Sequence, residues 1–137
     1  MEMESLRNFE TICIEVPKVY DFCFQAERRE NICTPLAQSF VPPSGATVRC
    51  TIKNASCSEV SRSEPNESGR ANVTFAAVVT YKLEVLNTEG EVVLTLRNLT
   101  FSFTKTVVLC APEGTFTNCE IVNAACGPCL ILGNQIC

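Results

Sequence analysis

Residues 71–86, ANVTFAAVVTYKLEVL, place apolar and polar side chains in alternation. The odd positions carry the larger apolar set, namely Val73, Phe75, Ala77, Val79, Tyr81, Leu83 and Val85, while Asn72, Thr74, Thr80, Lys82 and Glu84 fall between them. Successive side chains of a strand point to opposite faces, so a period of two indicates a long, half-buried β-strand. This stretch predicts the centre of a β-sheet.

The next residues predict a hairpin. Asn87-Thr88-Glu89-Gly90 is typical of a type I turn in which glycine takes the left-handed position. The return strand starts at Glu91, with apolar residues first at even positions (Val92, Leu94, Leu96) and then at odd ones (Leu99, Phe101, Phe103). A one-residue slip moves every side chain to the other face, so we expect a β-bulge near Arg97–Asn98.

The remaining elements are shorter. Alternating or β-prone stretches at 11–16, 19–26, 46–52, 115–122 and 129–137 predict further strands, and the polar stretch 58–70 predicts an exposed loop. No segment has the 3.6-residue period of a helix. The sequence therefore predicts an all-β protein: an antiparallel β-sandwich or open barrel with a long central hairpin, cross-linked by disulfides. Residues 1–10 are expected to form an N-terminal arm, and residues 11–137 a single domain.

Composition restricts the function. The 137 residues carry a net charge of −4, the 11 basic residues are scattered, and no apolar run is long enough for a membrane helix. We therefore expect neither nucleic acid nor membrane as a partner. The chain has no histidine, which removes the usual general base near neutral pH and the commonest metal ligand. The prediction is a protein that is not an enzyme and binds no cofactor or metal.

Ten cysteines make up about 7% of the chain, close to the level of a disulfide scaffold. Such scaffolds usually belong to secreted proteins, yet the opening residues MEMESLRNFE lack the basic and apolar regions of a signal peptide. A domain of this size does not require five internal bridges, and cysteines are frequent near both ends. This distribution favours covalent links between copies. Ten cysteines allow about 945 complete pairings, so the sequence does not give the pairing.

Two alternatives use the cysteines differently. Cys126-Gly127-Pro128-Cys129 has the letters of a thioredoxin dithiol, but no βαβ pattern precedes it and only eight residues follow. A Cys-ligated zinc or iron–sulfur site could draw on the five cysteines from position 110 onward, although a second CxxC is missing. A third alternative is a secreted, disulfide-rich domain that binds a receptor.

Two motifs carry a family resemblance. Residues 16–21, VPKVYD, and residues 109–115, LCAPEGT, together with the cysteine-rich ending, resemble the cysteine-rich spore-surface proteins of endospore-forming Firmicutes. The resemblance implies a structural subunit that is made in the mother-cell cytoplasm without a signal peptide. It would assemble with copies of itself, and with other spore-envelope proteins, into an exosporium lattice, a coat layer or an appendage fibre.

On this hypothesis the cysteines divide into two groups. Those near the ends are the candidates for inter-subunit disulfides: Cys13, Cys23, Cys126, Cys129 and Cys137. The others are candidates for further disulfides: Cys33, Cys50, Cys57, Cys110 and Cys119. Unpaired sheet edges and apolar faces would drive the association that these bonds then fix.

Overall fold

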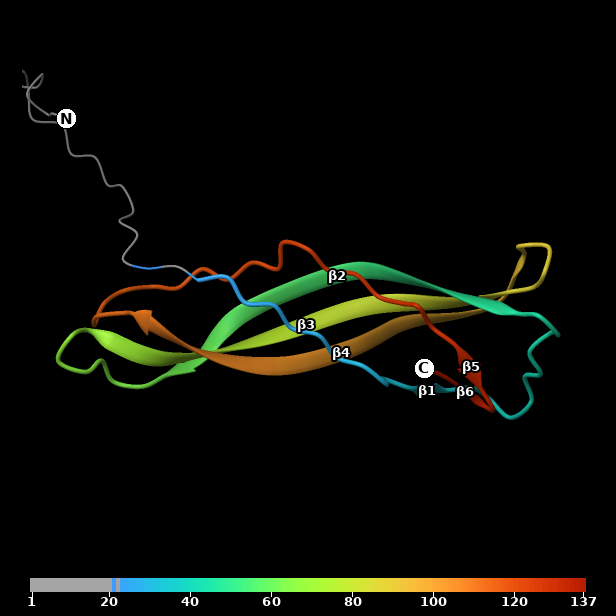
Figure 1. Cartoon of the computed structure of the whole chain (residues 1–137), viewed down its shortest axis with the longest axis horizontal. Helices are drawn as coiled ribbons and strands as arrows, with labels where there is room; N and C mark the ends of the chain where they lie inside the picture. The colour runs from blue at the N-terminus through green and yellow to red at the C-terminus, as the bar shows by residue number, and fades with distance from the viewer. Residues whose placement is uncertain (1–20, 22) are drawn as a thin grey trace, which may run out of the picture.

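A computed structural model describes residue 21 and residues 23–137, which form strands and connecting segments but no helix (Figure 1). The strands are β1 (Thr34–Pro35), β2 (Thr47–Arg62), β3 (Arg70–Leu86), β4 (Val92–Cys110), β5 (Ile131–Leu132) and β6 (Gln135–Ile136). They make two antiparallel sheets, so the predicted all-β antiparallel class is confirmed. The predicted arm 1–10 and the predicted strand 11–16 lie outside the described residues.

The larger sheet contains the three long strands in the order β2-β3-β4, with β3 in the middle. On β3 the side chains of Val73, Ala77, Leu83 and Val85 are buried, whereas Asn72 and Val78 between them are exposed. The alternation read from the sequence therefore separates an inner apolar face of this sheet from an outer, more polar face.

The hairpin between β3 and β4 forms as predicted. Gly90 has a φ of 84°, and the Oδ1 atom of Asn87 accepts hydrogen bonds from the backbone N–H groups of Glu89 and Glu91, both at 2.9 Å. The bulge is also confirmed. Tyr81 pairs with Leu99 but Leu83 pairs with Leu96, so β4 inserts one extra residue at the predicted position, where Asn98 takes a φ of 55°.

A second layer crosses the inner face of the large sheet. It consists of two extended segments, residues 23–33 and 112–130, which run in the same direction along the sheet (Figure 1, blue and orange-red). Both end in the small sheet, which has the order β1-β6-β5. Regular pairing in this layer is confined to the two-residue strands of that sheet, and the rest is extended chain.

Four sequence-based predictions need correction. The predicted loop 58–70 is wrong in its first part, because β2 continues to Arg62 and Ser58 pairs with Ala76. Its polar residues suit an edge strand whose outer face meets water. The predicted strands 19–26, where described, and 115–122 are not strands in the structure, which gives these positions no regular secondary structure. Residues 129–137 contain a short hairpin of β5 and β6 in place of one strand.

The core is divided between the two ends of the large sheet. Leu36, which directly follows β1, and Ile136 of β6 pack with Leu83 and Val85 at one end. At the other end a smaller cluster contains Ala71, Val73 and Ala111. Within the described part of the chain, no helix is present that could cross a lipid bilayer.

Candidate functional site

Three disulfides attach the second layer to the rest of the molecule: Cys33–Cys137, Cys50–Cys126 and Cys57–Cys119. The pairs are nested, since each bond lies inside the previous one along the sequence. Nested pairing fixes the segment 119–137 antiparallel to the segment 33–57. Two of the bonds start on the inner face of β2, because Cys50 and Cys57 pair with Leu83 and Ala77 of the apolar face.

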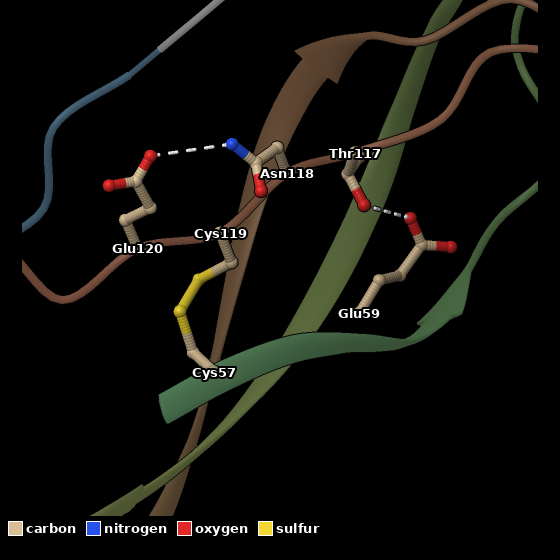
Figure 2. Close-up of a disulfide and its surroundings, with 6 residues drawn as sticks. All are labelled: Cys57, Glu59, Thr117, Asn118, Cys119 and Glu120. Atoms are coloured by element: carbon tan, nitrogen blue, oxygen red, sulfur yellow. Dashed lines mark hydrogen bonds between the residues drawn. A yellow bond between two sulfur atoms is a disulfide. The ribbon is translucent and has the colours of Figure 1, made fainter. Parts of the chain in front are cut away.

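A polar cluster adjoins the innermost bond, as Figure 2 shows. The Thr117 hydroxyl donates a hydrogen bond of 2.7 Å to Oε1 of Glu59, two residues beyond Cys57 on β2. Arg62 donates to both oxygens of Glu59, at 2.9 and 2.7 Å, and its Nη1 donates to the Thr115 hydroxyl at 3.2 Å. The disulfide and these hydrogen bonds together fasten residues 115–119 to β2.

The charge of Glu59 is stabilised by these same partners. The hydrogen bonds from Arg62, and then from Thr117, lower the pKa of Glu59 from 4.5 to about 2, against the opposing effect of partial burial. Glu59 is therefore ionised throughout the physiological pH range. Its role in the structure is to hold the second layer, with no sign of the raised pKa expected of a general acid.

The other extended segment of the second layer, residues 23–33, lies over β4. The carboxylate of Asp21 accepts a hydrogen bond of 2.9 Å from the backbone N–H of Cys110. Lys105 donates a hydrogen bond of 3.0 Å to Glu27, which also pairs with Arg29, and these contacts lower the pKa of Glu27, with the Lys105 bond as the largest cause. The guanidinium of Arg29 lies 5.3 Å from the centre of the Phe103 ring.

The contact between Asp21 and Cys110 joins the two motifs singled out in the sequence. Asp21 is the last residue of VPKVYD and Cys110 the second residue of LCAPEGT. They are 89 positions apart in the chain. Of the first motif the structure describes Asp21 alone, and its contact with Cys110 holds this residue at the end of β4.

The predicted inter-subunit cysteines separate into different states. Cys126 and Cys137 belong to intrachain disulfides, which is a correction to their predicted role, because strand packing places Cys50 and Cys33 next to them. Cys23 and Cys129 form no disulfide within the part of the chain that the structure describes, and Cys13 lies outside it. Of the other candidates, Cys33, Cys50, Cys57 and Cys119 are bonded, whereas Cys110 is not.

The CGPC motif has surroundings unlike those of a redox dithiol. Cys126 is bonded to Cys50, while Cys129 is a half-buried thiol packed beside the core cluster of Leu83 and Val85. Burial raises the pKa of the Cys129 thiol, which reduces the thiolate that thiol–disulfide exchange requires. No group of three or more Cys, Asp or Glu side chains converges as a metal site in the residues the structure describes.

Between the two extended segments lies a groove of about 1390 Å³. Residues 23–32 over β4 form one wall, and residues 117–130 over β2 form the other. The floor is the inner face of β3 and the adjoining part of β4, made of Phe75, Ala77, Val79, Tyr81, Phe101 and Phe103. Most of these floor side chains are only half-buried, in contrast to Val73 and Val85 at the two ends.

No family model, curated protein or solved structure matches this chain. No pattern in the sequence predicts the groove. The signal that could have found it is the length of the apolar stretches that form β3 and β4, which are 17 and 19 residues long.

Proposed function

We propose that this protein is a structural subunit that assembles with its own copies into a disulfide-cross-linked polymer of the spore surface. The observation that carries the proposal is the division of the cysteines. Six are closed in nested intrachain bonds that fasten the second layer, whereas Cys23, Cys110 and Cys129 remain as thiols. The chain thus has an internally locked fold and separate sulfurs for links to neighbours.

The edges of the large sheet support association. β2 and β4 are its edge strands and are 16 and 19 residues long. Edge strands of this length present rows of backbone donors and acceptors that pair readily with another chain. Val60 on β2 and Val92, Val93 and Val108 on β4 are exposed. Apolar side chains along an edge add a driving force for pairing between copies.

After the copies have associated, disulfide bonds form between them. Two thiols on neighbouring copies lose two protons and two electrons and form one S–S bond, with dioxygen or a small-molecule disulfide as the oxidant. Cys23 is exposed and Cys110 and Cys129 are half-buried at different places on the fold. With Cys13 of the N-terminal region they give each copy more than one bonding position, as a polymer requires.

The spore location rests on the resemblance of residues 16–21 and 109–115 to spore-surface proteins. The hydrogen bond between Asp21 and Cys110, one residue from each of these stretches, is in keeping with a shared role for the two motifs.

Gel electrophoresis tests the proposal. The purified chain is incubated in air, boiled in detergent and run with and without reductant. We expect a ladder of multiples of 15.0 kDa that collapses to one band with reductant. The control is C13S/C23S/C110S/C129S, which keeps the three intrachain bonds and should run as a monomer. A wild-type chain that runs only at 15.0 kDa without reductant contradicts the proposal.

A further inference from the structure

One edge of the large sheet carries a regular row of outward backbone groups. β4 is an edge strand, and Cys110 donates its backbone N–H to Asp21, away from the neighbouring strand β3. Along an antiparallel strand, residues whose backbone groups point to the neighbour alternate with residues whose groups point away. From Leu99 to Cys110, β4 pairs with β3 without a register shift. The residues with outward N–H and C=O groups are therefore Thr100, Ser102, Thr104, Thr106 and Val108.

Contacts of β3 support this assignment. Asn72, the partner of Val108, accepts a hydrogen bond of 2.9 Å from the N–H of Ser63 and donates its own N–H to the Ser63 hydroxyl at 2.8 Å. Because the backbone groups of Asn72 are directed to the β2 side, those of Val108 are directed to the open edge. The hydroxyls of Thr74 and Thr106 lie 2.8 Å apart, in agreement with the close side chains of a pair without backbone hydrogen bonds.

The outward groups of β4 are open in the described part of the chain. Apart from the pairing with β3, no backbone-to-backbone hydrogen bond among the described residues reaches residues 99–109. The segment 23–33 contacts β4 from the inner face, through the side chains of Phe103 and Lys105. The residues with outward groups are all exposed. A long open edge of this kind is a template for another strand.

The ends of the open row define its centre. A bulge interrupts β4 at one end, where Asn98 has a φ of 55°, and the N–H of Cys110 is already occupied at the other end. The regular row thus runs from Thr100 to Val108 and has Thr104 in its middle. A strand that pairs antiparallel with a copy of itself places its middle residue opposite the same residue of the copy. The row therefore fits a second copy of itself about a two-fold axis at Thr104.

We propose that β4 of one copy pairs antiparallel with β4 of a second copy, with Thr104 on the two-fold axis. The proposal rests on the self-assembly proposed above and names its first non-covalent contact. The two large sheets join into one sheet with the strand order β2-β3-β4-β4-β3-β2. The β2 edges remain outside this contact, and disulfides between dimers then build the polymer.

The side chains are compatible with this register. The opposed pairs are Leu99–Leu109, Phe101–Val107 and Phe103–Lys105 on the inner face, and Thr100–Val108, Ser102–Thr106 and Thr104–Thr104 on the outer face. No pair combines like charges, and pairs of apolar or hydroxyl side chains stabilise neighbouring strands. The apolar residues of the inner face are only half-buried in one copy. The partner strand therefore covers apolar surface in addition to pairing the backbone.

β2, the other edge of the large sheet, is less suited to pairing. Its register shifts between Ile52 and Asn54 and again between Glu59 and Ser61, so its row of outward groups is interrupted twice. An exposed lysine, Lys53, lies at the first of these irregularities. Bulges and lysine side chains are features by which natural proteins prevent edge pairing. The β4 edge has neither feature between Thr100 and Thr104, and its Lys105 is held by Glu27.

Sedimentation velocity tests the pairing in the absence of disulfides between copies. The parent is C13S/C23S/C110S/C129S, and the variant adds T104P, which removes an N–H that points to the partner and none that pairs with β3. We expect a concentration-dependent dimer of the parent and a dissociation constant raised at least about tenfold by T104P. The control T104V keeps the N–H and should dimerise like the parent. A parent that stays monomeric up to roughly 1 mM overturns the proposal.

Single cysteine substitutions in the same parent locate the axis. Opposite residues of a hydrogen-bonded pair have Cα atoms about 5.5 Å apart, which suits a disulfide. With oxidised glutathione, T104C should form a covalent dimer at least about tenfold faster than T100C, because the two copies of position 100 lie roughly 27 Å apart. T100C mixed with V108C should form the mixed dimer. Equal rates for T104C and T100C, or a dimer of S56C on β2 that forms as fast as that of T104C, overturn the proposal.

The two proposals fail separately. A reducible ladder from the wild type without a T104C dimer removes the β4 pairing and leaves the disulfide polymer. A T104C dimer without any wild-type ladder removes the covalent polymer and leaves the paired sheet.

Discussion

Cys126 forms its disulfide with Cys50 on β2, 76 positions earlier in the chain, while Cys129 three residues further on remains a thiol. The CGPC motif has the sequence of a redox dithiol, but the bond between Cys126 and Cys50 makes it an attachment point between the two layers. It also leaves one sulfur of the motif beside the core.

Cys23 and Cys129, two of the thiols among the described residues, are expected to differ in reactivity. Cys23 is exposed, whereas Cys129 is half-buried and burial raises its pKa, so less of it is thiolate at a given pH. In freshly prepared monomer, iodoacetamide should label Cys23 several-fold faster than Cys129, as followed by peptide mass spectrometry. The same digest should contain Cys50 linked to Cys126. A peptide with Cys126 linked to Cys129 would contradict the structure.

Removal of the innermost disulfide is expected to loosen the second layer. Cys57 and Cys119 each lie seven residues from the cysteines of the next bond, Cys50 and Cys126, so the bond closes a ring of roughly 15 residues. The double substitution C57S/C119S should lower the free energy of unfolding by about 2–3 kcal/mol. Denaturant unfolding provides the measurement. The control C23S alters an exposed, unbonded cysteine and should leave stability unchanged.

Acid is expected to weaken the attachment at Glu59. The pKa of Glu59 is about 2 in the folded chain and near 4.5 when it is unfolded. A depressed carboxyl pKa contributes stability above pH 4.5 that is lost as the pH falls through 4.5 toward 2. At pH 6, E59Q should lower the free energy of unfolding by about 1–2 kcal/mol.

A comparison of the wild type with E59Q at several pH values isolates the contribution of Glu59 to stability. Between pH 5 and pH 2 the free energy of unfolding should fall further in the wild type than in E59Q. Glu84 and Glu27, whose pKa values are also lowered, are present in both chains, so their contributions cancel in the comparison. The matched control is E67Q, an exposed glutamate in the neighbouring turn. Parallel curves for the wild type and E59Q would show that Glu59 does not hold the segment 115–119.

Gly45 is expected to tolerate no side chain. Its φ is +76°, and an added Cβ would lie 2.8 Å from Cγ2 of Thr88 in the hairpin turn. G45A should therefore lower the thermal midpoint, with a cost of about 1–2 kcal/mol from strained backbone and the close contact. G114A is the informative control, since Gly114 has a similar φ of +84° but no atom within 4 Å of the added Cβ. An equal loss in both variants would assign the effect to backbone strain alone.

Local patterns explain the parts of the fold that were predicted. The alternation in residues 71–86, the Asn87–Gly90 turn and the change of apolar phase near Asn98 are properties of neighbouring residues, and all three appear in the structure. The strand end at Arg62 was missed because residues 58–62 are polar on an edge strand. Hydrogen bonds to β3 hold them in the sheet, without help from an apolar pattern.

For the candidate site, the sequence predicted which residues take part but not how they pair. The sequence supplied the ten cysteines, and the nested pairing of six of them depends on which strands lie beside which. Cys126 and Cys137 were assigned to neighbouring copies because their positions near the chain end gave no information on Cys50 and Cys33. The groove had no local signal, since its floor and walls come from four separate parts of the chain.

The amino-acid sequence alone determined that this chain is a β protein, with one long hairpin, a bulge within it and an excess of cysteines. The tertiary structure decided which sulfurs bond and which part of the apolar sheet stays uncovered. The physical reason is the distance along the chain over which each interaction acts. Side-chain alternation and turn preference act over a few residues, whereas a disulfide partner and a second layer are chosen by packing between segments up to 104 positions apart.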